Sequence, residues 1–458
     1  MASTTQMETD AADGRAGRKP ARGLGLWMAT ALVAGNMIGS GVFLLPASLA
    51  PFGGISIVGW LVTAAGALML ALVFANLSRV FPRIGGPYAY SRMAFGDFIG
   101  FQMAWGYWIA IWAGNAAIAV AFVGYLGVFL PAVTASPFAS MATGVAAIWI
   151  LTGINILGVR AAGWVQLVTT VAKILPLLAV GLVGIFWLEP AHFLPFNATG
   201  GSAFSAVNAV AALTLWAFLG LESASIPADD VEAPERTIPR STILGTLIAT
   251  VVYVLGTVAV MGIVPPEVLQ ASTAPFADAA RAIWGSGAGQ LIAIGALFST
   301  FGALNGWILL QGQIPLAAAK DRLFPARFRG VSANGTPVFG LVVSSILVTV
   351  LMATSYSEGL VGVFNFTLLL ATMTTLVPYM FTAMGELMLF FQNREAFSGK
   401  RFAGSGVVAA LAFLYSIWAV AGSGEDVVFW GSLLLFAGIP VYVWLKWQDQ
   451  AVQSQDRR

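Results

Sequence analysis

The segment that decides the fold is residues 35–41, GNMIGSG, which interrupts an apolar run extending from about residue 25 to residue 50. Three glycines and two polar residues fall here, near the middle of what would otherwise be one membrane-spanning helix. Unpaired backbone groups are costly in hydrocarbon, so an interrupted helix persists at membrane depth only inside the protein or beside a cavity. The segment therefore predicts a broken helix that lines a central cavity.

A second interruption is WAFLGLES, residues 216–223, which places Gly220 and Glu222 inside the apolar run at 205–228. The two interrupted runs lie five spans apart, and five is odd, so a second five-helix unit would be inverted in the membrane. Interrupted helices at matching positions of two inverted repeats are typical of secondary transporters with a site at mid-membrane. The alternative is a packing seam, because membrane helices use small residues where their backbones approach closely.

Composition independently assigns the chain to the membrane. Of 458 residues, 58% are hydrophobic and only 9% are charged, whereas a soluble domain carries about 25% charged residues. A membrane-spanning helix needs about 20 apolar residues. Twelve such runs are present, and β-barrel alternation is absent, so we expect an all-α integral membrane protein with a 5+5 inverted-repeat fold and broken first and sixth helices. The runs lie at about 25–50, 55–78, 98–130, 138–159, 162–188, 205–228, 241–264, 288–318, 337–355, 360–390, 403–421 and 427–446.

Charge asymmetry predicts the orientation. With both termini placed in the cytoplasm, all 22 basic residues except Arg281 and Lys173 fall on the cytoplasmic side, as the positive-inside rule requires. We therefore expect a multi-pass protein of the cell inner membrane, embedded in the lipid bilayer. Its expected parts are a disordered tail (1–23), a first repeat (24–188), a second repeat (204–390), two further helices (402–446) and a cytoplasmic tail (447–458).

The same composition excludes several classes of function. Cysteine is absent, His192 is the single histidine and the net charge is only +2, so we expect no metal centre, no cofactor, no thiolate catalysis and no nucleic-acid partner. A membrane enzyme would lack a nucleophile–base pair, and a channel would lack polar residues to line a continuous pore. Glu386, near a cytoplasmic helix end, is expected to be an ordinary interfacial carboxylate.

The two breaks also indicate a ligand chemistry. A helix beginning near Gly41 presents free N–H groups and the positive end of its dipole, which suit a carboxylate. A helical segment ending near Leu219 presents free carbonyls, which suit an ammonium group. A zwitterionic amino-acid backbone satisfies both ends.

Several motifs resemble the amino acid–polyamine–organocation (APC) transporters, and most closely the bacterial arginine/agmatine antiporters among them. The resemblance extends from residue 25 to residue 446. The motifs are GNMIGSGVFLLP (35–46), GGPYAY (85–90), Tyr107-Trp108, Gly114-Asn115, the segments 216–225 and 272–281, and LVPY (376–379). It implies an antiporter that works by alternating access and exchanges a cationic amino acid, arginine, for its amine, agmatine. It also implies a possible homodimer.

The resemblance further implies roles for individual residues. Ser40 and Gly41 would bind the substrate carboxylate, and the carbonyls of Met37, Trp216 and Leu219 would accept the α-ammonium group. A second set would act on the guanidinium, with Trp307 stacking against it and the Ala110 carbonyl and Asn115 hydrogen-bonding it. Trp216 would also form a lid, and Tyr107, Glu222 and Tyr379 would form an inner gate in which Glu222 responds to pH.

Three positions depart from the pattern. Ile111 and Ala371 stand where the antiporters have small polar groups, which removes hydrogen-bonding capacity toward a guanidinium. Lys173 lies near the middle of the fifth span, where a charge is costly and usually marks a pathway or a relay. It favours an alternative function, a proton-coupled amino-acid symporter, although a purely structural lysine bonded to first-helix carbonyls would fit as well.

Overall fold

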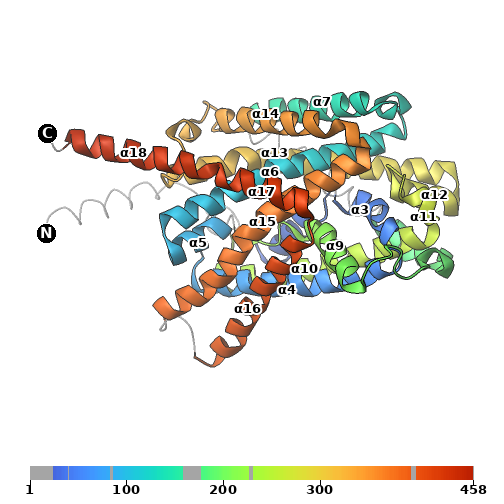
Figure 1. Cartoon of the computed structure of the whole chain (residues 1–458), viewed down its shortest axis with the longest axis horizontal. Helices are drawn as coiled ribbons and strands as arrows, with labels where there is room; N and C mark the ends of the chain where they lie inside the picture. The colour runs from blue at the N-terminus through green and yellow to red at the C-terminus, as the bar shows by residue number, and fades with distance from the viewer. Residues whose placement is uncertain are drawn as a thin grey trace.

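The computed structural model describes residues 24–39, 41–82, 86–157, 177–225, 231–393 and 399–456. These residues form an all-helical bundle (Figure 1). The predicted N-terminal tail, Ser40 and Lys173 lie outside the described residues.

Most of the long helices begin and end within a few residues of the predicted apolar runs. They are α4 (Ile55–Val80), α6 (Asp97–Gly127), α7 (Pro137–Ile156), α10 (Pro234–Ile263), α13 (Ser286–Lys320), α14 (Val338–Ser355), α15 (Gly359–Gln392), α16 (Gly399–Ala421), α17 (Glu425–Phe436) and α18 (Gly438–Asp456). The chain is thus an all-helical membrane protein.

By length and apolar composition, the described part of the chain contains nine stretches that can cross a membrane, or ten when the bent pair near the N-terminus is taken as one span. Two features explain why this number of spans is lower than the predicted twelve. The predicted fifth span, 162–188, lies mostly outside the described residues. The stretch Val338–Gln392 holds two helices, α14 and α15, on either side of a turn at Tyr356–Glu358. The number twelve stays a prediction.

Both predicted breaks are present. The first span consists of α2 (Leu26–Met37) and α3 (Gly41–Leu49), and its two parts are bent by 42°. In the sixth, α9 (Ala203–Leu215) gives way to short 3-10 turns at Trp216–Phe218 and Ser223–Ser225. Gly220 lies between these turns at φ +102°, in the left-handed region that favours glycine.

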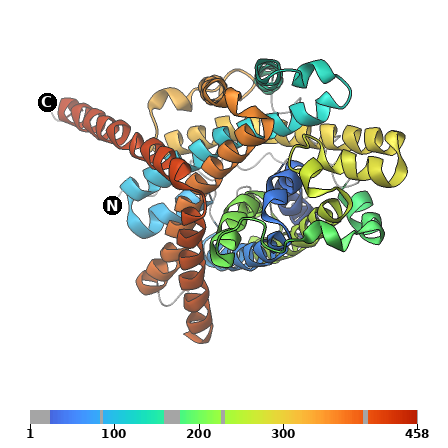
Figure 2. The ribbon, with the colours of Figure 1, turned by 45° about the vertical axis from the view of Figure 1, so that its right-hand side comes forward.

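The two breaks lie against each other. A Cβ built at Gly220 would stand 3.4 Å from the Cβ of Asn36 in the first break. Around them the helices form two groups. In one group α10 packs against α4 and α2, and α9 packs against α4; in the other α6 packs against α13 and α15 (Figure 2). The breaks therefore lie in the interior, where freed backbone groups can meet protein partners or a ligand.

Short connecting helices mark the two ends of the bundle. In Figure 1, α5 (Pro87–Phe95) and α18 lie toward one end of the long axis, whereas α11 (Pro266–Leu269) and α12 (Pro275–Trp284) lie toward the other. The sequence places the segment around α5 in the cytoplasm and the segment around α12 outside. Their separation in space is what that topology requires.

A polar network holds the α5 end together. Arg92 on α5 pairs with Asp97 at 2.9 Å and with Asp321 at 3.5 Å, and Lys446 on α18 pairs with Asp97 at 3.2 Å. Tyr88 donates to Asp321 at 3.1 Å. Burial, and next the Asp321 carboxylate, raise the pKa of Tyr88, so its hydroxyl remains a neutral donor at physiological pH.

The C-terminal segment contains a division that the sequence analysis did not predict. The apolar run at 427–446 is divided at Ala437, because Pro440 cannot continue the helical hydrogen bonds of α17. The carbonyl of Leu434, released at this division, accepts a hydrogen bond from the indole of Trp105 at 2.9 Å. Helix α18 continues to Asp456, so the described part of the predicted cytoplasmic tail is helical, and the segment 447–456 contains neither glycine nor proline.

Candidate functional site

The two breaks enclose a small cavity. It is lined by Asn36, Met37, Gly39, Ile118, Trp216, Leu219 and Trp307. The lining residues come from the first break, from α6, from the second break and from α13. None of them is acidic, so a cation in the cavity would meet aromatic faces and carbonyl oxygens rather than a carboxylate.

Two indole rings form one wall of the cavity. The rings of Trp216 and Trp307 stack with centroids 6.4 Å apart and an interplanar angle of 28°. Gly114 on α6 makes room for Trp216, since a side chain at that position would collide with the indole. Trp307 is half-buried and packs against Tyr107 and Ile111 of α6.

Backbone groups of the two breaks face the same region. Met37 is the last residue of α2, and its carbonyl accepts from the Gly39 amide at 2.8 Å. The Trp216 carbonyl accepts from the Leu219 amide at 3.1 Å. A carbonyl oxygen has two lone pairs, so each of these retains capacity for a ligand donor. Gly41 begins α3, whose first N–H groups have no partner within the helix.

A buried carboxylate lies next to the second break. Glu222 is fully buried. Its Oε1 accepts from the Tyr107 hydroxyl, and its Oε2 accepts from the Tyr379 hydroxyl at 2.5 Å. Tyr107 belongs to α6 and Tyr379 to α15. The structure thus brings together the three residues expected to form a gate, and they connect the second break to both helices.

Asn115 and Ala110 lie on α6 beside the cavity but do not line it. Asn115 is fully buried, and its Nδ2 donates to Oε1 of Gln311 on α13 at 2.7 Å. Sequence reasoning missed Gln311. The signal was available, because an amide in the apolar run of α13, one helical turn after Trp307, is costly unless its hydrogen bonds are satisfied.

A groove leads from one side of the protein toward the cavity. It runs between α2 and α13 and extends from Leu24 to Asn36 and Trp307, and these last two residues line both spaces. Asn36 and Trp307 therefore separate the groove from the cavity.

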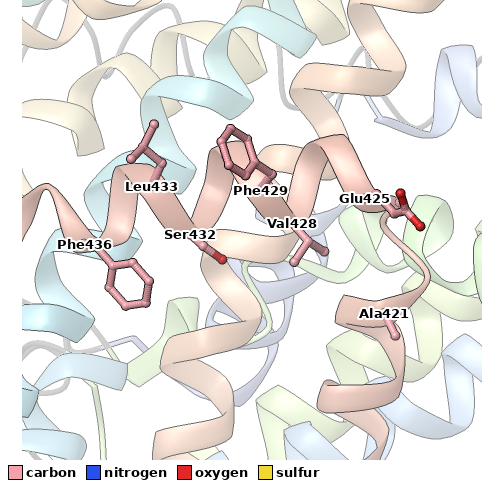
Figure 3. A pocket seen from close by; sticks show the side chains of 8 residues that line it. Ala421, Glu425, Val428, Phe429, Ser432, Leu433 and Phe436 are labelled. Carbon is pink, nitrogen blue, oxygen red and sulfur yellow. The ribbon is translucent and has the colours of Figure 1, made fainter.

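A second groove lies elsewhere, along α17 (Figure 3). Its wall is apolar, with Phe429, Leu433 and Phe436 exposed, and Glu425 lies at one end. It contains none of the predicted site residues. Its residues have the character of a surface that faces lipid chains.

Comparison with known proteins agrees with this architecture. Residues 24–444 match the family model described as amino acid permease. Among solved structures, the Eremococcus coleocola manganese transporter superposes with a TM-score of 0.57 at 14% identity, covering 91% of this chain and 93% of that one. At that identity the likeness concerns the fold alone.

Curated relatives cover nearly the whole chain. A Bacillus subtilis (strain 168) protein, whose name assigns it provisionally to arginine/ornithine antiport, is 34% identical over 91% of this chain and 96% of its own length. The putrescine transporter PotE of Haemophilus influenzae is 33% identical, with 92% and 96% covered. The cadaverine/lysine antiporter of Escherichia coli (strain K12) is 36% identical, with 80% and 83% covered. The chain therefore belongs to the amino acid permease family of the APC superfamily, and it is a membrane transporter rather than an enzyme.

Proposed function

We propose that this transporter is an antiporter that exchanges a cationic amino acid for its amine by alternating access at the cavity between the two breaks. One observation carries the proposal. The cavity has a wall of two stacked indoles and no acidic side chain in its lining. Such a site suits a cation held by aromatic faces and backbone carbonyls.

The amino-acid backbone would bind at the helix ends. The N-terminus of α3, with Ser40 and Gly41, would hold the carboxylate, because free N–H groups and the helix dipole favour negative charge there. The carbonyls of Met37, Trp216 and Leu219 would accept the ammonium group. An amine that lacks the carboxylate would keep the second set of contacts and lose the first.

The cationic side chain would lie against Trp307. A cation on an indole face is worth about 0.5–1 kcal/mol when exposed and about 2 kcal/mol when desolvated. The Ala110 carbonyl and Asn115, on the neighbouring face of α6, would accept hydrogen bonds from it. Glu222 is not among the residues that line this cavity, and its two oxygens already accept the Tyr107 and Tyr379 hydroxyls.

The relatives' names give cationic amino acids and amines: arginine with ornithine, which are both amino acids, lysine with its amine cadaverine, and putrescine by itself. Arginine with agmatine is the pair that the sequence resemblance favours. Ile111 and Ala371 stand where that resemblance would have polar groups, so ornithine with putrescine and lysine with cadaverine belong in the same test.

Alternating access would use the groove and the buried carboxylate. Substrate would enter along the groove between α2 and α13, from the side where α2 begins, and would pass Asn36 and Trp307. The hydrogen bonds of Glu222 with Tyr107 and Tyr379 would hold the second break against α6 and α15, and their release would accompany the change of access.

The test is uptake of labelled arginine, lysine and ornithine into proteoliposomes that contain the corresponding amine, the same amino acid or nothing. The proposal predicts uptake only with trapped substrate, and no loss of that uptake with a protonophore. Uptake into empty vesicles that a protonophore abolishes, and that Lys173→Ala also abolishes, would replace exchange by proton symport.

A further inference from the structure

A series of buried hydrogen bonds connects the backbone carbonyls of Ile148 and Leu341 to the side chain of Asn115. Gln311 on α13 is fully buried, and its Nε2 donates to the Ser345 hydroxyl at 2.8 Å and to the Leu341 carbonyl at 3.3 Å. Its Oε1 accepts from Nδ2 of Asn115. The Ser345 hydroxyl lies 2.7 Å from the hydroxyl of Thr152 on α7.

The direction of each bond in this series is determined. Thr152 donates its single hydroxyl proton to the Ile148 carbonyl at 2.8 Å. Ser345 must therefore be the donor to Thr152, and its oxygen is left to accept from Gln311. The Leu341 carbonyl can only accept, so it also requires the nitrogen of Gln311 on that side. The oxygen of Gln311 is consequently turned toward Asn115.

This direction fixes the amide of Asn115 in turn. Because Gln311 presents an oxygen, Asn115 must present its nitrogen to Gln311, and its own oxygen is left over. Asn115 Oδ1 is buried and accepts no hydrogen bond from the described residues. A buried acceptor without a partner is costly, so it favours a ligand that donates a hydrogen bond.

Asn115 lies on α6 near residues that line the cavity or pack beside it. On α6 it lies between Ile111, four residues earlier, and Ile118, three residues later, and residues with these spacings share one helix face. Ile118 lines the cavity, and Ile111 packs with Trp307. Gln311 follows Trp307 by four residues on α13, and so it shares the face that Trp307 presents.

We infer that Gln311 is a specificity-determining positioning residue: by accepting from Nδ2 of Asn115 it orients the amide so that the unpartnered oxygen Oδ1 is offered to the far end of the substrate. This inference rests on the proposed function. The site then admits side chains that end in N–H donors, guanidinium or ammonium groups, and it disfavours those that end in an oxygen acceptor.

The test compares arginine with citrulline, which carries a carbonyl oxygen in place of one guanidinium nitrogen. Gln311→Met removes the constraint on Asn115 and keeps a side chain of similar length. We expect the KM for arginine exchange to rise roughly tenfold, as loss of a hydrogen bond to a charged group implies. The maximal rate should stay within about twofold, and inhibition by citrulline should be unchanged or stronger. The arginine/citrulline preference therefore falls.

A double-mutant cycle separates positioning from a structural defect. If Gln311 acts through Asn115, Asn115→Leu with Gln311→Met is no worse for arginine than Asn115→Leu alone. Ser345→Ala, a milder change in the same series of bonds, should shift the preference in the same direction by less. Ser416→Ala, which removes a fully buried hydroxyl on α16, is the matched control and should leave the preference unchanged.

Two results would overturn the inference alone: an equal loss for arginine and citrulline in Gln311→Met and Ser345→Ala, or additive effects in the cycle. A wild-type protein that exchanges no cationic amino acid or amine would overturn the proposed function and this inference with it.

Discussion

At the scale of single residues, the protonation state of the buried Glu222 carboxylate is expected to control the contacts that hold the second break. Its two tyrosine partners belong to α6 and α15, so protonation of one side chain affects contacts with both helices. A hydrogen bond to a carboxylate is roughly twice as strong as one to a neutral acceptor. Protonation of Glu222 should therefore weaken the contacts that hold the second break.

Glu222→Gln is expected to behave as a permanently protonated form. Exchange by the wild type should become faster as the pH falls, because the two tyrosine bonds weaken, whereas the variant should be fast and independent of pH. Initial exchange rates measured over a pH series check this. Glu425→Gln, at the exposed start of α17, should keep the wild-type profile. A Glu222→Gln profile identical to that of the wild type would show that another group senses pH.

At the scale of elements, the second break depends on Gly220. Its φ of +102° costs an alanine roughly 1–2 kcal/mol, and this strain would act where the second break lies in van der Waals contact with Asn36 of the first. Gly220→Ala should therefore lower both the melting temperature and the exchange rate.

Gly200→Ala separates the two effects. Gly200 has φ +70° in an exposed loop and no atom within 4 Å of the added Cβ. It should lower the melting temperature similarly and leave exchange intact. Equal exchange rates in the two variants would mean that the contact between the breaks has no part in transport.

Glu386 was expected at an interface with water, and that expectation is wrong: the residue, on α15, is 2% exposed and is covered by α4 and α16. Its Oε1 accepts from Asn76 of α4 at 3.1 Å and from Ser405 of α16, and its Oε2 has no partner among the described residues. Position along a helix gave its depth but could not reveal that α4 and α16 cover it.

Glu386→Gln should preserve thermal stability, because the amide keeps an acceptor for Asn76 and Ser405 and removes a charge from the interior. Glu386→Leu leaves the Ser405 hydroxyl without its acceptor, while Asn76 keeps its hydrogen bond to Ser405 at 3.1 Å, and it should cost about 1–3 kcal/mol for the group left unsatisfied. Thermal unfolding in detergent measures the difference. A Leu variant as stable as the Gln variant would contradict this account of the cluster.

Sequence patterns predicted most of the helix ends and both breaks, because glycine and polar residues inside an apolar run disfavour a continuous membrane helix at that depth. They did not predict the division at Ala437 or the role of Gln311. Pro440 was a signal for the division, but the uniform apolar content across Ala437 favoured a single run. The orientation of Gln311 depends on Leu341 and Ser345, thirty and thirty-four residues away along the chain. Hydrogen-bond partners that lie on another helix can be identified only once the helices are placed side by side in space.

At the scale of the whole molecule, the predicted orientation can be tested directly because the chain contains no cysteine. Thr199→Cys introduces one thiol in an exposed loop predicted outside, and Gln450→Cys introduces one on exposed α18, predicted inside. A membrane-impermeant maleimide applied to right-side-out vesicles should label position 199 alone and both positions after lysis. Labelling of position 450 in intact vesicles would reverse the topology.

The central claim is that a cationic substrate binds between the two breaks against Trp307. The most direct measurement is the calorimetric titration of arginine and agmatine, and of the other two pairs, into purified wild type, Trp307→Leu and Trp430→Leu. Trp430 lies half-exposed on α17, away from the cavity. We predict that Trp307→Leu weakens binding of the favoured pair roughly tenfold and that Trp430→Leu binds like the wild type. Equal affinities in all three proteins would contradict the account.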